Sequence, residues 1–207
     1  MADQFQAAGK LPYMQWIFLD APENRDVMQQ AWYAPTELPS VAPSRPELAD
    51  PEDEDGMMHS VKHVVSIIDD LVANGVPPSR VVVGGFSQGH ATTLLTGLLS
   101  KYSGKLAGLV ALSGYLPLID RIDDLRSEAG LPKQMAERRP MFVVRGKADI
   151  AIPRRYLKMQ MDKLRDLGYK DEEIELHEYE GLQHTSSGQE LRDLCIWLEK
   201  ILPPIEP

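Results

Sequence analysis

Residues 80–90 read Arg-Val-Val-Val-Gly-Gly-Phe-Ser-Gln-Gly-His, and this stretch decides the fold of the chain. The β-branched valines at 81–83 are typical of a short buried strand. Apolar residues then recur at helical spacing, at Ala91, Leu94, Leu95, Leu98 and Leu99. Ser87 therefore lies on a strand-to-helix turn, and Gly85 and Gly89 flank it because side chains at such a sharp reversal would collide.

In this context the Gly-x-Ser-x-Gly pattern indicates the nucleophile elbow of an α/β-hydrolase, which presents a reactive serine hydroxyl. The helix that begins at Gln88 adds a positive dipole end and unpaired N–H groups beside the Ser87 hydroxyl. Both features suit chemistry in which negative charge develops on an oxygen. The alternative interpretation is a glycine-rich connecting turn with no catalytic role.

Length and composition limit the architecture and the partners. A chain of 207 residues with 43% hydrophobic residues suits one globular domain, residues 1–207, with a sizeable buried core. The formal charge of −9 argues against nucleic acid, because affinity for a phosphate backbone depends on clusters of Lys and Arg. We therefore expect neither DNA nor RNA as a partner, and the sequence leaves a homodimer open.

Cysteine usage and the N-terminal residues bear on the compartment. Cys195 is the only cysteine, so neither an intrachain disulfide nor a four-thiolate metal site can form, which favours a reducing compartment. Residues 1–10 lack the apolar core of a signal peptide, and no run of about 18 apolar residues is present to span a membrane. We expect a cytoplasmic protein without stable membrane insertion.

Two clusters could in principle hold a cation, but the sequence favours simpler interpretations of both. The acidic run at 51–56 lacks the spaced ligands of a calcium loop and is typical of a solvated helix start. His59 and His63 lie one helical turn apart without an evident third ligand. The sequence therefore predicts no metal site, and it suggests no cofactor.

The rest of the chain alternates expected strands with expected helices. These elements are a strand at Trp16–Ala21, a proline-rich loop at 35–51, a helix at 58–72, strands at 106–114 and 141–144, a helix at 153–167, a strand at 173–179 and a final helix at 187–202. Residues 116–139 mix prolines, charges and short apolar patches, and we expect them to form a cap of broken helix and loop over the site. The alternation predicts an α/β fold, a doubly wound and mostly parallel sheet of about five strands with helices on both faces.

Three residue types that serve nucleophilic catalysis follow three of the expected strands. In a doubly wound sheet ligands bind at the carboxyl ends of the strands, where Ser87, Asp149 and His184 should meet. Their order along the chain is the one found in α/β-hydrolases. A serine hydroxyl needs an imidazole to take its proton and a carboxylate to fix the imidazole tautomer, so we predict a Ser-His-Asp triad. Asp171 and Glu180 are the alternative carboxylates.

Among the histidines, His184 is the one placed after the last expected strand. His177 lies within that strand, and His90 lies on the elbow helix, so we interpret both as structural.

The chain resembles the acyl-protein thioesterase and carboxylesterase branch of the α/β-hydrolases over nearly its whole length. The matching pieces are Gly-Phe-Ser-Gln-Gly at 85–89, Leu-Ser-Gly-Tyr-Leu-Pro-Leu at 112–118, Gly-Lys-Ala-Asp at 146–149 with Pro153, Gly-Leu-Gln-His at 181–184 and Leu-Pro-Pro at 202–204. The resemblance implies a serine hydrolase that cleaves small-molecule or protein-linked acyl esters or thioesters through an acyl-enzyme intermediate. It implies the triad named above and the Gln88 amide as one oxyanion donor.

The resemblance also implies where the substrate binds. The residues concerned are Tyr115, Leu116, Leu118 and Trp32. In relatives, the segment equivalent to residues 115–118 helps to shape an acyl-chain channel, although a simply packed cap explains these apolar residues equally well.

The resemblance is incomplete at the front of the chain. Members of this branch open with an apolar strand ending in His-Gly-x-Gly, whose loop gives a second oxyanion amide, and nothing of that kind precedes Trp16. Arg145, Lys147 and His90 also stand where histidine, aspartate and glycine are usual. Loss of one oxyanion donor can cost about 10² to 10³ in rate. The alternative function is therefore a catalytically weak or inactive hydrolase-derived protein that binds an acyl or other apolar ligand.

The missing front strand would lie in the middle of the sheet, next to the nucleophile strand. Either Trp16–Ala21 pairs directly with Val81–Gly85, or a partner chain supplies the strand, or the chain is a truncated version that folds poorly. For a well-ordered monomer we expect direct pairing.

Overall fold

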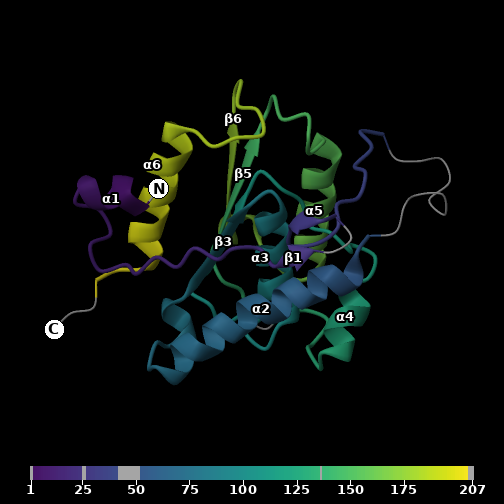
Figure 1. Cartoon of the computed structure of the whole chain (residues 1–207), viewed down its shortest axis with the longest axis horizontal. Coiled ribbons are helices and arrows are strands. Elements are labelled where there is room, and N and C mark those ends of the chain that lie inside the picture. The colour runs from purple at the N-terminus through teal and green to yellow at the C-terminus, as the bar shows by residue number, and fades with distance from the viewer. Residues whose placement is uncertain (1, 25–26, 42–51, 136, 205–207) are drawn as a thin grey trace.

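The structure, a computed structural model, describes residues 2–24, 27–41, 52–135 and 137–204. Its centre is a parallel sheet of four strands that neighbour one another in chain order (Figure 1). These strands are β3 (Val82–Phe86), β4 (Gly108–Leu112), β5 (Met141–Gly146) and β6 (Ile174–Tyr179). A parallel pair needs a crossover connection, and the intervening helices are α3 (Gln88–Leu99), α4 (Ile122–Glu128) and α5 (Arg154–Asp166). The α/β fold predicted from the alternating pattern is confirmed.

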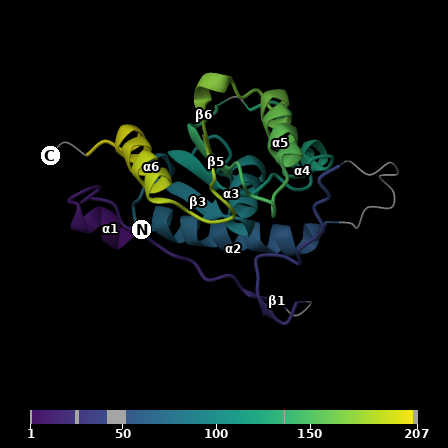
Figure 2. The same ribbon diagram turned by 90° about the horizontal axis from the view of Figure 1, so that it is seen from above.

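Helices cover both faces of this sheet (Figure 2). Successive strand residues point to opposite faces, so Leu109 and Ala111 of β4 enter one hydrophobic core while Val110 and Leu112 enter another. The first core is closed by α3, α4, α5 and α2 (Glu54–Ala73), and the second by α6 (Gly188–Ile201) and α1 (Ala2–Ala7). This is the doubly wound arrangement expected from the near-continuous apolar runs of the central strands.

The acidic run at 51–56 is predicted to start a helix. Its described residues, 52–56, do so at the beginning of α2. Asp53 is the N-cap, and its Oδ1 accepts a hydrogen bond of 2.9 Å from the Gly56 amide. Glu54 and Asp55 lie in the first turn, where negative charge is favourable beside the helix dipole. From residue 42 to residue 51, the expected proline-rich loop falls outside the described residues.

The prediction of a strand at Trp16–Ala21 is wrong. This segment has no regular secondary structure, and among the described residues β4 is the ladder partner of β3 and no second strand joins it. Trp16 packs against the second core and Leu19 against the first, so the segment crosses the edge of the sheet from one layer to the other (Figures 1 and 2). A chain that runs across an edge cannot keep a ladder of hydrogen bonds along it.

The predicted direct pairing of this segment with Val81–Gly85 is therefore also wrong, and within the described residues the main sheet has four strands instead of about five. A separate antiparallel ladder joins β1 (Glu23–Asn24) to β2 (Gln29–Gln30), away from the main sheet.

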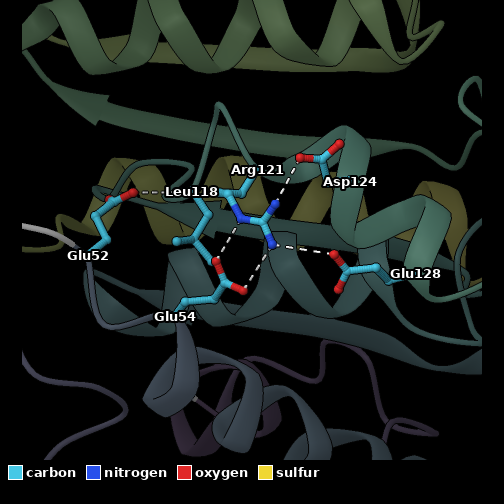
Figure 3. Close-up of polar contacts among 6 residues, drawn as sticks. All are labelled: Glu52, Glu54, Leu118, Arg121, Asp124 and Glu128. Atoms are coloured by element: carbon cyan, nitrogen blue, oxygen red, sulfur yellow. Dashed lines mark hydrogen bonds and ion pairs between the residues drawn. The ribbon is translucent and has the colours of Figure 1, made fainter. Parts of the chain in front are cut away.

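The segment expected to form a cap is fastened to the start of α2 (Figure 3). Glu52 accepts a hydrogen bond of 2.6 Å from the Leu118 amide, and burial raises the pKa of this carboxyl. Arg121 donates to Glu54 at 3.1 Å and also pairs with Asp124 and Glu128 at 2.8 and 3.4 Å. The start of α4 is thus held by carboxylates on two elements. The far end of α4 packs beside the C-terminal end of α3, where Arg126 donates to the Leu98 carbonyl.

Candidate active site

Ser87 lies on the sharp turn between β3 and α3, as the sequence predicts. Its backbone has φ 56° and ψ −114°, a conformation that residues with a side chain rarely adopt. The Ser87 amide donates a hydrogen bond of 2.9 Å to the Leu112 carbonyl, which ties the turn to the neighbouring strand. The turn therefore places the serine at the carboxyl end of the sheet, where an α/β fold binds its ligands.

The two glycines that flank Ser87 have different steric roles. A Cβ on Gly85 would lie 2.6 Å from the Gly89 Cα and closer still to its carbonyl, whereas a Cβ on Gly89 would meet nothing within 4 Å. We expect Gly85→Ala to destabilise the fold by about 1 to 3 kcal/mol, because backbone must move to make room. The matched variant Gly89→Ala should keep or slightly raise stability, since alanine is the better helix former.

Thermal or urea unfolding of the two variants measures this difference. Equal Tm values for the two variants would show that the close approach at Gly85 does not decide the elbow geometry.

The structure brings Ser87, His184 and Asp149 together. His184 Nε2 lies 2.9 Å from Ser87 Oγ, and His184 Nδ1 lies 2.8 Å from Asp149 Oδ2. A carboxylate only accepts hydrogen bonds, so the proton of the imidazole is on Nδ1. Nε2 is then free to accept a proton from the serine hydroxyl.

Asp149 is held by its own loop. Its side chain has no exposed surface, and Oδ1 accepts hydrogen bonds from the Ala151 and Ile152 amides at 2.8 and 3.1 Å. Together with His184, three donors converge on the two carboxylate oxygens. The buried charge is thereby compensated, which a buried carboxylate requires.

His184 is positioned by the loop that follows β6. The Ala148 amide donates to the Leu182 carbonyl at 3.0 Å, and the carbonyls of this loop pass so close to Gly146 that a Cβ there would collide with them. The imidazole also packs against the ring of Phe86, with centroids 4.9 Å apart. The loop that carries His184 thus packs against the C-terminal end of β5 and against Phe86, the residue before Ser87.

Gln88 has a second role that sequence reasoning missed. Its amide lies at the first position of α3, where helix geometry provides no intrahelical acceptor, and this is the predicted oxyanion donor. Its side chain accepts from the Trp32 amide at 3.1 Å and donates to the Tyr33 carbonyl at 3.0 Å. One side-chain amide thus holds the segment around Trp32 beside the elbow.

The residues expected to bind substrate lie in different surroundings. Trp32 is half-buried and its ring lies against His63, with centroids 6.3 Å apart. Tyr115 packs edge-on against Tyr156. Leu116 and Leu118 belong to the first core, with 1% and 5% of their surface exposed. This burial is what the alternative to an acyl channel, simple packing of the segment, predicts for these two leucines.

The side chains of His90 and His177, and of the alternative carboxylates, have partners other than Ser87 and His184. His90 is buried in α3, and the His177 ring packs against the rings of Phe142 and Tyr179. The alternative carboxylates pair with surface cations, Asp171 with Arg165 and Glu180 with Lys147.

Within the described ranges, no group of three or more His, Cys, Asp or Glu side chains is arranged to hold a metal ion. In the same part of the chain, no helix combines the length and apolar character needed to cross a membrane.

Comparisons with known proteins agree on one family. Residues 1–202 match the family described as phospholipase/carboxylesterase. The chain is 34% identical over 206 residues to acyl-protein thioesterase 1 of Yarrowia lipolytica, covering 97% of this chain and 83% of that protein. The corresponding protein of Emericella nidulans is 29% identical over 209 residues, covering 98% of this chain and 83% of its own length.

Solved structures give the same result. SOBER1 of Arabidopsis thaliana superposes with a TM-score of 0.78 at 28% identity, over 97% of this chain and 89% of that chain. Acyl-protein thioesterase 2 of Zea mays gives a TM-score of 0.73 at 26% identity, over 97% and 88% of the two chains.

Proposed function

The chain belongs to the phospholipase/carboxylesterase family, and on this premise we propose that it hydrolyses acyl esters and thioesters with Ser87 as nucleophile, His184 as base and Asp149 as its partner. The observation that carries the proposal is the unbroken series of contacts from the Asp149 carboxylate through His184 to the Ser87 hydroxyl, at 2.8 and 2.9 Å. These lengths are in the range of hydrogen bonds through which a base accepts the proton of a nucleophile.

The proposed reaction has two halves. Ser87 Oγ attacks the acyl carbon while its proton moves to His184 Nε2, and the Asp149 carboxylate stabilises the imidazolium. The C–O or C–S bond to the leaving group then breaks, and His184 returns the proton to the departing alcohol or thiol. Water, deprotonated by His184, next attacks the acyl-enzyme. The bond from the acyl carbon to Ser87 Oγ breaks, the carboxylic acid leaves, and His184 returns the proton to Ser87 Oγ.

We assign the Gln88 amide to the oxyanion of the tetrahedral intermediate. It is the backbone N–H that directly follows the nucleophile, and it lies at the positive end of α3, a helix of 12 residues. A donor fixed in this way needs no reorganisation when the oxyanion forms, which is how such groups lower the barrier.

Two exposed apolar side chains beside the triad support an acyl substrate. Phe86, which precedes the nucleophile, is 38% exposed, and Ile150, which follows the acid, is 94% exposed. Together with the half-buried Trp32, they offer apolar surface to an acyl chain. The substrates are then small acyl esters or thioesters, or acyl groups on proteins as the names of the curated relatives indicate. The buried, unpaired Cys195 fits the reducing cytoplasm that the sequence favours.

The test measures hydrolysis by the purified protein of two substrate classes. The first is a series of p-nitrophenyl esters of increasing acyl-chain length, and the second is an S-acylated peptide whose hydrolysis is monitored by the appearance of the free thiol. We expect hydrolysis of both classes. A protein that binds a fluorescent fatty acid and hydrolyses neither substrate would be the inactive, ligand-binding relative instead.

A further inference from the structure

His90, three residues after the nucleophile, is a buried polar side chain that the reaction itself does not use. It lies in the first turn of α3 and is 1% exposed. The Gly114 amide donates to His90 Nδ1 at 3.0 Å, so this ring nitrogen is an acceptor. The proton is therefore on Nε2, which lies 2.8 Å from Gln160 Oε1 on α5. The ring thus joins the loop after β4 to α3 on one side and α5 on the other.

The contact with Gly114 adds to a hydrogen bond that the elbow itself makes with the neighbouring strand. At one end, the Ser87 amide donates to the Leu112 carbonyl at 2.9 Å, and at the other, Gly114 is tied to His90. Between these ends the two segments are in close contact, because a Cβ on Gly114 would lie 2.6 Å from the Ser87 carbonyl oxygen and 2.5 Å from the His90 Cβ. The Gln88 amide lies between Ser87 and His90, the two residues of the elbow that make these hydrogen bonds.

Both turns joined in this way are strained. Ser87 has φ 56° and Ser113 has φ 46°, and neither is a glycine. Backbone in such sparsely populated conformations costs about 1 to 3 kcal/mol per residue and persists only where the surroundings enforce it. A hydrogen bond across the two turns supplies such enforcement.

We propose that His90 is a positioning residue whose Nδ1, by holding Gly114, keeps Ser87 and the Gln88 amide in their reactive arrangement. This inference rests on the proposed function. Burial lowers the pKa of His90 to about 4, so the ring stays neutral and Nδ1 remains an acceptor at neutral pH. A protonated ring would present a donor to the Gly114 amide and break the contact.

Three variants separate the two hydrogen bonds of the ring. His90→Asn places an acceptor oxygen where Nδ1 lies and keeps the Gly114 contact without the one to Gln160. His90→Leu fills similar space and removes both contacts. Gln160→Met removes the partner of Nε2 and leaves the Gly114 contact in place, so it is the matched control.

We expect kcat of His90→Leu on a short p-nitrophenyl ester to fall by about tenfold to 10²-fold with KM within about twofold, since a small displacement of a reacting group costs that much. His90→Asn and Gln160→Met should keep kcat within about threefold of the wild type. An equal loss of kcat in His90→Asn and His90→Leu would overturn the proposal, because the rate would then not depend on the hydrogen bond to Gly114.

Hydrogen exchange reports on the same contact without turnover. The Gly114 amide should exchange about tenfold faster or more in His90→Leu than in the wild type, and at nearly the wild-type rate in His90→Asn. Unchanged exchange in His90→Leu would also overturn the proposal. A wild-type protein without esterase activity but with this exchange pattern would refute the proposed function and leave the fastening role of His90 supported.

Discussion

Replacing Ser87 with alanine should lower kcat/KM for a short p-nitrophenyl ester by about 10³-fold or more, because the attacking oxygen is removed while the oxyanion donor and the base remain. The hydroxyl contributes little to folding. It lies 2.9 Å from His184 Nε2 on a half-buried residue, so its loss leaves no other buried partner unpaired. The variant should therefore unfold at nearly the wild-type Tm, and the loss of rate can be assigned to chemistry.

Ser113 provides a matched control for this substitution. It follows β4 at the same edge of the sheet and also has a positive φ, and its buried hydroxyl has no hydrogen-bond partner among the described residues. Ser113→Ala removes the same atoms and should retain activity within about threefold, since no interaction is lost. A fluorophosphonate should modify wild type and Ser113→Ala with a mass increase on the peptide containing residue 87, and should not modify Ser87→Ala. Turnover by Ser87→Ala at the wild-type rate would remove Ser87 from the mechanism.

That Ser87, Asp149 and His184 lie together was predictable, because each of them is marked by a local pattern. Gly85 before Ser87 is a glycine where a side chain would collide with the helix backbone, and Gly146 before Asp149 is a glycine where a side chain would collide with the carbonyls of the loop around His184. The strand-helix alternation then places Ser87, Asp149 and His184 at one edge, because all the main strands are parallel. Each of these patterns, the flanking glycines and the strand and helix beside them, lies within a short range of sequence.

The misplaced strand shows where such reasoning fails. Trp16–Ala21 is apolar enough to pass for a strand, but the two cores divide it, since Trp16 packs on the α6 side and Leu19 on the α2 and α3 side. Whether an apolar segment runs along a sheet or across its edge depends on the neighbouring layers. The local pattern carries no information on that choice.

The contacts that support the site were also beyond local patterns. The Gln88 side chain reaches Trp32 and Tyr33, which lie 56 and 55 residues away in sequence, and His90 reaches Gln160, which is 70 residues away. Glutamine and histidine at such positions are equally consistent with exposed residues. The absence of charged residues from α3, the helix that contains His90, is the one available signal, and it indicates burial without naming the partner.

Replacing Asp149 with asparagine should reduce kcat by about 10³- to 10⁴-fold while the fold stays intact. The reason lies in the surroundings of the carboxylate. The Ala151 and Ile152 amides both point at Oδ1, so the carbonyl oxygen of the new side chain must take that position, and its NH₂ group must face His184. Histidine can then meet this donor only with an unprotonated Nδ1, which moves the ring proton to Nε2 and leaves no acceptor for the Ser87 hydroxyl.

Tm and kcat together test this tautomer argument. The variant retains both loop hydrogen bonds to residue 149, so Tm should change little, whereas Asp149→Ala loses them and should be less stable by about 1 to 3 kcal/mol. Asp171→Asn is the control for the alternative carboxylate, which pairs with Arg165 at the surface, and it should keep wild-type activity. If Asp149→Asn lost less than about tenfold in kcat, the tautomer of His184 would not depend on Asp149, and the assignment of the acid would be wrong.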